Sequence, residues 1–250
     1  TMSYSASALS FMLENLSKPV IFTGSQLPIG DLRTDARENL ITSIHLASLK
    51  ENNISVIQEV GLYFEYKLYR GNRTTKINSE NFEAFVSANY PLLAQSGVHL
   101  KVHKEYLLRN KENQKLNIFT DFDTNVAIIK IFPGITATIL EGMLAIPHLK
   151  GVVIETYGSG NAPTAKWFLE TLEKAVKKGL IIVNVTQCIG GAVIPNKYET
   201  GTYLEKIGVI NGKNLTTEAA ITKLMFLLGK NKNVNDLKIS YEKSLRGEND

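Results

Sequence analysis

The sequence predicts an α/β fold with two domains, in which a parallel sheet flanked by helices is followed by a smaller α/β domain. Two observations lead to this prediction. Short apolar runs that are typical of buried parallel strands alternate along the chain with segments whose apolar residues recur at helical spacing. The alternation is interrupted once, at residues 98–120, which divides the chain into a first domain at 1–120 and a second at 125–250.

The first domain is expected to begin with a helix that runs to about Leu16. Residues 18–24 then predict a short strand that ends in a glycine turn, and residues 54–71 are rich in strand-forming residues. Between them, residues 32–50 predict a helix that Asp35 or the threonine before it could cap. The buried face of this helix is expected to carry four apolar residues, Leu40, Ile41, Ile44 and Ala47.

Two alternating segments, 98–110 and 115–122, flank the polar run 111–114 and predict a hairpin that closes the first domain. From residue 125 onward, strands and helices alternate again, which predicts a parallel sheet covered by helices. The predicted strands are 126–134, 151–160 and 180–188, and the predicted helices are 136–145, 163–179 and 216–230.

The composition of the 250 residues is that of a globular protein and disfavours several classes of function. The formal net charge is +4 and the charges are interspersed, so no basic stripe for nucleic acid is visible. The single cysteine, Cys188, excludes an intrachain disulfide and agrees with a reducing compartment. No apolar run approaches the roughly 18 residues that cross a bilayer, and no signal peptide is visible. We therefore expect a cytoplasmic protein with no nucleic-acid or membrane partner.

Three loops that follow predicted strands could carry chemistry, since ligands of open α/β sheets bind beyond the carboxyl ends of the strands. They are TGSQLP at 23–28, RGNRTTK at 70–76 and YGSGNAP at 157–163. The last of these could be a dinucleotide loop or a tight turn from which Asn161 projects. The dinucleotide alternative is weak, because Pro163 occupies the third glycine position of that motif.

Few of the titratable residues have the spacing or the partners expected of a catalytic or metal-binding site. None of the four histidines has metal-ligand spacing with another histidine, a cysteine or a carboxylate, so we expect no metal site. A lone cysteine is most often a small buried hydrophobe, which is the expectation for Cys188. Lys76 is either a solvated surface charge or a functional lysine. The second role would require burial, a carboxylate partner and a hydroxyl group to serve.

Four stretches of the chain resemble bacterial type I L-asparaginases: 1–28, 68–76, 157–163 and 183–188. The resemblance extends in order to about residue 245. It implies an asparaginase-type fold and the hydrolysis of L-asparagine to L-aspartate and ammonia without a cofactor. In such enzymes a threonine hydroxyl attacks the side-chain amide carbon and forms an acyl-enzyme that water cleaves. A hydroxyl needs a base or a charge network for this attack.

The resemblance assigns roles to several residues. Lys76 matches the lysine that joins a threonine–aspartate pair at the catalytic centre. Ser25 matches a loop position whose main chain approaches the substrate amide. Asn161 matches an asparagine that reaches the site of a neighbouring subunit, which implies a homodimer or homotetramer with shared sites. Arg70 and Arg73 are expected to make structural contacts around their loop.

The resemblance also implies that N-terminal strands and the nucleophile lie upstream of these residues. Thr1 matches the last threonine of the family motif HGTDTM. The threonine–aspartate pair of that motif, and the TGGT loop that carries the nucleophile, would therefore precede Thr1. We expect an upstream segment, because the first domain could not close without its core strands.

Some type I enzymes also have an allosteric asparagine site, and three positions of the chain correspond to it. Thr75 and Cys188 match the threonine and cysteine of that site, but Glu155 stands where the family has an arginine. A carboxylate at this position would repel the α-carboxylate of the ligand instead of clamping it. We therefore expect the allosteric response to be lost or altered.

Two alternatives remain open from the sequence. One is a non-catalytic protein that binds amino acids through the same pocket. The other is an amidase that acts on a different amide, such as a subunit of a tRNA amidotransferase.

Overall fold

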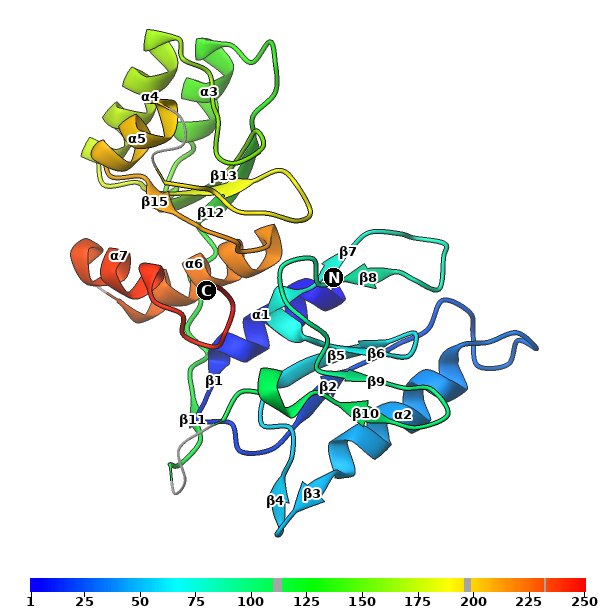
Figure 1. Cartoon of the computed structure of the whole chain (residues 1–250). Coiled ribbons are helices and arrows are strands. Elements are labelled where there is room, and N and C mark those ends of the chain that lie inside the picture. Colours follow the sequence, from blue (N-terminus) through cyan, green and yellow to red (C-terminus); the bar gives the residue numbers. More distant parts are fainter. Residues whose placement is uncertain (110–113, 196–198, 232) are drawn as a thin grey trace. The chain divides into compact units, whose positions relative to one another are not determined.

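The computed structural model describes residues 1–109, 114–195, 199–231 and 233–250. The chain forms two compact units of similar length, Thr1–Thr120 and Asp121–Asp250. Both units combine a sheet with helices (Figure 1), which confirms the predicted α/β class.

The first unit is built around a five-stranded sheet with the order β10-β9-β6-β5-β2. β2 and β5 run parallel, whereas the pairs β5–β6, β6–β9 and β9–β10 are antiparallel. β5 is buried at every position, and its Tyr63 packs in one core cluster with Leu46 of α2 and Leu68 of β6. The strands are β2 (Val20–Phe22), β5 (Val60–Phe64), β6 (Lys67–Arg70), β9 (Ala94–Gln95) and β10 (Lys101–Val102).

The hairpin predicted from segments 98–110 and 115–122 is wrong. β10 pairs with β9, and β11 (Asn117–Ile118) pairs with β1 (Leu13–Glu14), so both segments find partners elsewhere in the chain. Because β1 takes up Leu13, helix α1 (Met2–Met12) ends before the expected Leu16. Residues 111–113 of the predicted turn lie outside the described residues. The smaller elements of this unit are β3 (Lys50–Glu51), β4 (Ile54–Ser55), η1 (Gly71–Arg73), β7 (Thr75–Lys76), β8 (Phe85–Val86) and η2 (Lys104–Tyr106).

Helix α2 (Ala36–Ser48) buries a different face from the one predicted. Its buried residues are Asn39, Ser43 and Leu46. The residues that were expected to be buried are exposed: Leu40, Ile41, Ile44 and Ala47. Asn39 points inward because its amide bonds the main chain of two other segments, accepting from Glu65 N and donating to Gly24 O. The hydrogen bonds of Asn39 and the packing of Leu46, and not the predicted apolar stripe, therefore define the buried face of this helix.

The second unit contains a four-stranded sheet with the order β12-β13-β14-β15, in which every pairing between described strands is parallel. Helices cover both faces (Figure 1). Ile154 of β13 belongs to a core cluster with Phe168 of α4, whereas Gly151 of the same strand faces Leu224 of α6. Successive odd and even positions of a strand point to opposite faces, so α4 and α6 lie on opposite sides of the sheet.

The elements of the second unit are β12 (Val126–Lys130), α3 (Ala137–Leu144), β13 (Gly151–Thr156), α4 (Lys166–Lys177), β14 (Ile181–Thr186), α5 (Glu199–Lys206), β15 (Ile210–Asn211), α6 (Thr217–Lys230) and α7 (Val234–Glu242). Among the described residues of both units, no helix has the length and apolar character needed to span a membrane.

Candidate functional site

The glycine loop after β2 is held in place by the first turn of α2. Both carboxylate oxygens of Asp35 accept from Gln26 N at 3.0 Å, and Oδ1 also accepts from Leu27 N at 3.1 Å. Asn39 Nδ2 donates to the carbonyl oxygen of Gly24 at 2.9 Å. Ser25, which is exposed, lies between Gly24 and Gln26, whose backbone groups make these hydrogen bonds. The backbone at this position is therefore fixed independently of its own side chain.

Sequence reasoning identified Asp35 only as a possible helix cap and missed its bonds to the loop. Its carboxylate does not cap α2; instead, Thr34 Oγ1 accepts from Ala36 N. The available signal was an aspartate at the start of a helix that directly follows a glycine loop, with Asn39 one turn later on the same face.

Replacing Asp35 by alanine is expected to loosen the loop. The Gln26 and Leu27 amides would lose a charged acceptor, and hydrogen bonds to charged groups contribute about 1.5–3 kcal/mol. Amide hydrogen exchange at these two residues should accelerate roughly tenfold or more. Asp31→Ala is the matched control, because Asp31 is an exposed aspartate of the same connection. Equal exchange rates in the two variants would show that Asp35 does not anchor the loop.

Arg70, the last residue of β6, and Arg73, in the connection from β6 to β7, are both buried. Arg70 Nε donates to Glu59 Oε2 at 2.6 Å, with side-chain exposures of 4% and 3%. The guanidinium carbons of Arg70 and Arg73 lie 4.2 and 4.9 Å from the centroid of the Tyr90 ring, within the range of cation–π attraction. These contacts agree with the expected structural role of both arginines.

Lys76 is exposed, and the neighbouring Thr75 is half-buried. Both residues form β7, which pairs with β8 so that Lys76 lies opposite Phe85. The ammonium is 5.8 Å from the centroid of the Phe85 ring, and no ion pair of Lys76 is seen in the part of the chain that the structure describes. The described residues therefore supply neither the burial nor the carboxylate partner that a functional lysine requires.

Residues 157–161 form a tight turn at the carboxyl end of β13, as one of the two alternatives for this loop predicted. The backbone groups of Tyr157 and Asn161 bond to each other in both directions at 2.8 Å. Gly158 and Gly160 have φ angles of +47° and +103°, which glycine adopts without steric cost. Asn161 Oδ1 accepts from Ala162 N at 3.0 Å, which orients the asparagine side chain.

Glu155 is bonded to the start of α6. Thr217 Oγ1 donates to Glu155 Oε1 at 2.6 Å, and Lys130 Nζ lies 3.9 Å from Oε2. The side chain of Glu155 is only 15% exposed. A carboxylate is favoured at the N-terminus of a helix, where the backbone N–H groups carry partial positive charge. The negative charge at this position is therefore stabilised by groups of the chain itself.

Cys188 is exposed, which corrects the expectation of a buried cysteine. It lies two residues after Thr186, the last residue of β14, and its backbone N–H donates to Thr186 Oγ1 at 3.0 Å. Gln187 Nε2 donates to the carbonyl oxygens of Glu155 and Ile131. These bonds tie together the ends of three strands, and sequence reasoning had not singled out Gln187.

The predicted site residues divide into two sets. Glu155, Asn161 and Cys188 lie at or beyond the carboxyl ends of β13 and β14, the edge where parallel sheets bind ligands. The other set (Ser25, Thr75 and Lys76) belongs to the first unit. In the residues that the structure describes, no group of three or more histidine, cysteine, aspartate or glutamate side chains could hold a metal.

Comparison with known proteins covers both units. Residues 1–108 match the family model "Asparaginase, N-terminal", and residues 125–239 match "Glutaminase/Asparaginase C-terminal domain". The chain is 41% identical over 248 residues to L-asparaginase 1 of Escherichia coli (strain K12), covering 99% of the chain and 71% of that protein. It is 43% identical over 249 residues to the 60 kDa lysophospholipase of Mus musculus, of which it covers 43%.

Structural comparison agrees with these matches. L-asparaginase I from Vibrio cholerae superimposes with a TM-score of 0.90 at 37% identity, covering all of this chain and 73% of the other. A more distant relative is a component of the glutamyl-tRNA(Gln) amidotransferase of Pyrococcus abyssi, 34% identical over 242 residues, of which the chain covers 54%. The predicted resemblance and the asparaginase-type fold are thus confirmed, and the chain belongs to the asparaginase family.

Proposed function

We propose that the protein is an amidohydrolase that cleaves L-asparagine to L-aspartate and ammonia, acting in the cytoplasm. The observation that carries this proposal is the likeness to L-asparaginase 1, which extends through both domains and includes the loops at 23–28, 70–76 and 157–163. The tRNA amidotransferase alternative has weaker support, because its relative is less similar. A non-catalytic amino-acid binder would share the fold and differ only in the absence of turnover.

The proposed reaction proceeds through a threonine acyl-enzyme. The hydroxyl oxygen attacks the side-chain amide carbon, ammonia leaves with the proton that the hydroxyl gives up, and water then cleaves the ester. The nucleophile and a threonine–aspartate pair would come from a segment N-terminal to Thr1. In this arrangement the exposed ammonium of Lys76 acquires its carboxylate and hydroxyl partners from that segment.

The loop at 23–28, which contains Ser25, would supply main-chain groups that are already in position to bind the substrate amide. Asp35 and Asn39 fix its backbone in advance, so little reorganisation is needed when the substrate amide binds. Asn161 would complete the site of a second subunit, which makes the active form a homodimer or homotetramer. The turn at 157–161 is suited to this role because the paired backbone bonds between Tyr157 and Asn161 fix the asparagine at the base of a defined turn.

The direct test is steady-state ammonia release by the protein together with its proposed upstream segment. L-Asparagine should be turned over. If L-asparagine binds without ammonia release, the amino-acid binder would replace this proposal. Release of ammonia only from another amide would favour the amidase alternative. Intact-mass measurement of the sample establishes whether the upstream segment is present.

The rate of such an enzyme should depend hyperbolically on asparagine concentration, with a Hill coefficient of about 1. The reason is Glu155, which stands where the resembling enzymes have a ligand-binding arginine and whose carboxylate accepts a hydrogen bond from Thr217 and lies near Lys130. The α-carboxylate of a ligand bound beside Glu155 would be repelled by the carboxylate of Glu155, because both groups are negative. The measurement is initial rate against asparagine concentration over a hundredfold range, and clear sigmoidality would contradict the expectation.

A further inference from the structure

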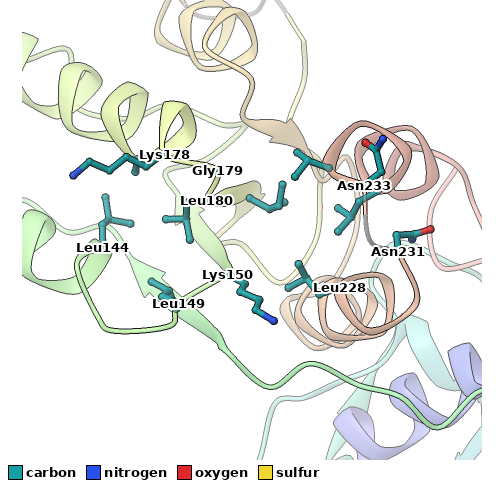
Figure 2. Close-up of a pocket in the computed structure, with 13 residues that line it drawn as sticks. Leu144, Leu149, Lys150, Lys178, Gly179, Leu180, Leu228, Asn231 and Asn233 are labelled. Atoms are coloured by element: carbon teal, nitrogen blue, oxygen red, sulfur yellow. The ribbon is translucent and has the colours of Figure 1, made fainter.

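A cavity of about 580 Å³ lies at the amino ends of β13 and β14 (Figure 2). Its walls come from the ends of α3, α4 and α6 and from the start of α7. Cavities of roughly 300–1,000 Å³ are the usual size for small-molecule sites. Glu155 lies four residues after Gly151, the first residue of β13, which is about 13 Å at the rise of a strand, so this cavity is separate from the candidate site at the opposite edge.

Polar and apolar groups contribute about equally to the surface of the cavity, and its apolar part is formed mainly by leucines. Five leucines line it: Leu144, Leu149, Leu180, Leu228 and Leu237. Figure 2 shows the labelled leucines on both sides of the opening, on segments far apart in the sequence. Leu180 and Leu237 are almost fully buried, at 8% and 2% exposure, and form solid walls. An apolar ligand body could therefore be shielded from water on several sides.

Gly179 helps to keep the cavity open. It has a φ angle of +94° and ends α4, where its N–H and that of Leu180 bond carbonyl groups of the last turn. A Cβ atom built on Gly179 meets nothing within 4 Å, so this part of the lining is open space. The residue that terminates the helix thus also leaves room beside the leucines.

The polar groups of the lining favour an anion. Two lysines, Lys150 and Lys178, line the cavity, and no aspartate or glutamate is among its lining residues. Lys150 Nζ already bonds Asp123 Oδ2 at 2.5 Å, so the exposed Lys178, whose side chain extends away from Leu180 and Leu228 in Figure 2, is the cation left at the margin to meet a ligand. Asn233, another lining residue, caps α7 by accepting a hydrogen bond from Asn235 N through its Oδ1. The cap does not use the Nδ2 hydrogens of Asn233.

We propose that this cavity binds a small anionic amphiphile, with its apolar body against the leucines and its carboxylate at Lys178. The combination of a leucine-lined part with the ammonium of Lys178, and with no aspartate or glutamate among the lining residues, matches such a ligand and disfavours a cationic one. The proposal concerns the second unit alone and does not depend on the proposed hydrolysis.

The test is titration of the whole chain, labelled at leucine methyl groups, with decanoate, followed by NMR. The methyl signals of Leu144, Leu149, Leu180 and Leu228 should shift and saturate together. Lys178→Glu should weaken decanoate binding about tenfold, since the attraction of an exposed ion pair is replaced by a repulsion. Lys174→Glu is the matched control, because Lys174 is exposed on the same helix one turn earlier and does not line the cavity.

Two further probes separate the apolar and ionic contributions. Each CH₂ removed between decanoate and hexanoate should weaken binding about three- to fourfold, which corresponds to ~0.8 kcal/mol per buried methylene. Decyltrimethylammonium should bind more weakly than decanoate. The proposal is overturned if millimolar decanoate leaves the four methyl signals unmoved or shifts others instead, if Lys178→Glu and Lys174→Glu behave alike, or if the cationic amphiphile binds equally well.

Discussion

Replacing Lys76 by alanine is expected to lower the turnover of L-asparagine about a thousandfold, within the range of roughly 10²–10⁴ that a positioned proton-transfer group contributes. Under the proposed function, the ammonium organises the protons of an attacking hydroxyl and a carboxylate. Because Lys76 is exposed on a two-residue strand, its removal leaves no cavity in the first unit. The measurement is kcat and KM from ammonia release, with the thermal midpoint recorded in parallel.

Lys101→Ala provides the control for this experiment. Lys101 is also exposed and also belongs to a two-residue strand of the first unit, β10. This variant should retain turnover within about twofold, as surface substitutions away from special features usually do. If Lys76→Ala kept the same turnover as Lys101→Ala while the unmodified protein was active, Lys76 would have no part in the chemistry.

Replacing Glu248 by glutamine is expected to destabilise the second unit by about 3–5 kcal/mol, the usual cost of removing one partner from a buried ion pair. Glu248 Oε1 lies 2.5 Å from Lys223 Nζ, and both side chains are fully buried, at 0% exposure. The Lys223 ammonium also donates to the carbonyl oxygen of Lys243. Without the carboxylate, this buried charge would lose its counter-ion. Urea unfolding of the whole chain, with and without the substitution, measures the change in the free energy of unfolding.

Two comparisons make the Glu248 result specific. Glu173→Gln removes the exposed pair with Lys177 and should leave the urea midpoint nearly unchanged. Converting Lys223 and Glu248 together to methionine and leucine removes both charges and should recover most of the lost stability. A loss below ~1 kcal/mol for Glu248→Gln would mean that the pair is not a major contribution.

The stability from Glu248 should also depend on pH. Burial by itself raises the pKa of this carboxyl group, but the Lys223 ammonium and the N–H groups of Leu245 and Arg246 outweigh burial, so the pKa is lowered overall. A lowered pKa gives stability that is present above the unfolded value of about 4.3 and is lost as the pH falls through the folded value. The urea midpoint should therefore fall more steeply below about pH 4 in the unmodified protein than in Glu248→Gln.

The parallel sheet of the second unit could be predicted from the sequence because its strands are long and apolar. β13 and β14 are six residues each and buried almost throughout, which produces the unbroken apolar runs typical of such strands. The loops that follow them could be placed for the same reason. The two-residue strands of the first unit, such as β7 and β10, are too short to show any period, so their pairing was not predictable.

The errors at α2 and at Cys188 have a different origin. Periodicity assigns apolar residues to the buried face, yet Asn39 occupies that face because its amide satisfies main-chain groups of distant segments. Cys188 follows the end of a strand and lies outside the core, although the cysteine side chain itself favours burial. For Asn39 the deciding partners, Gly24 and Glu65, are far away in sequence and leave no local signal, whereas the exposure of Cys188 follows from its place beyond the end of β14.

The exposed side of α2 has a practical consequence for work with this chain. Leu40, Ile41 and Ile44 place large aliphatic groups in water at 46%, 67% and 61% exposure. Exposed apolar side chains that lie close together promote aggregation in concentrated solution. Charged residues at positions 41 and 44 should reduce this association, because neither isoleucine is buried by the residues that the structure describes.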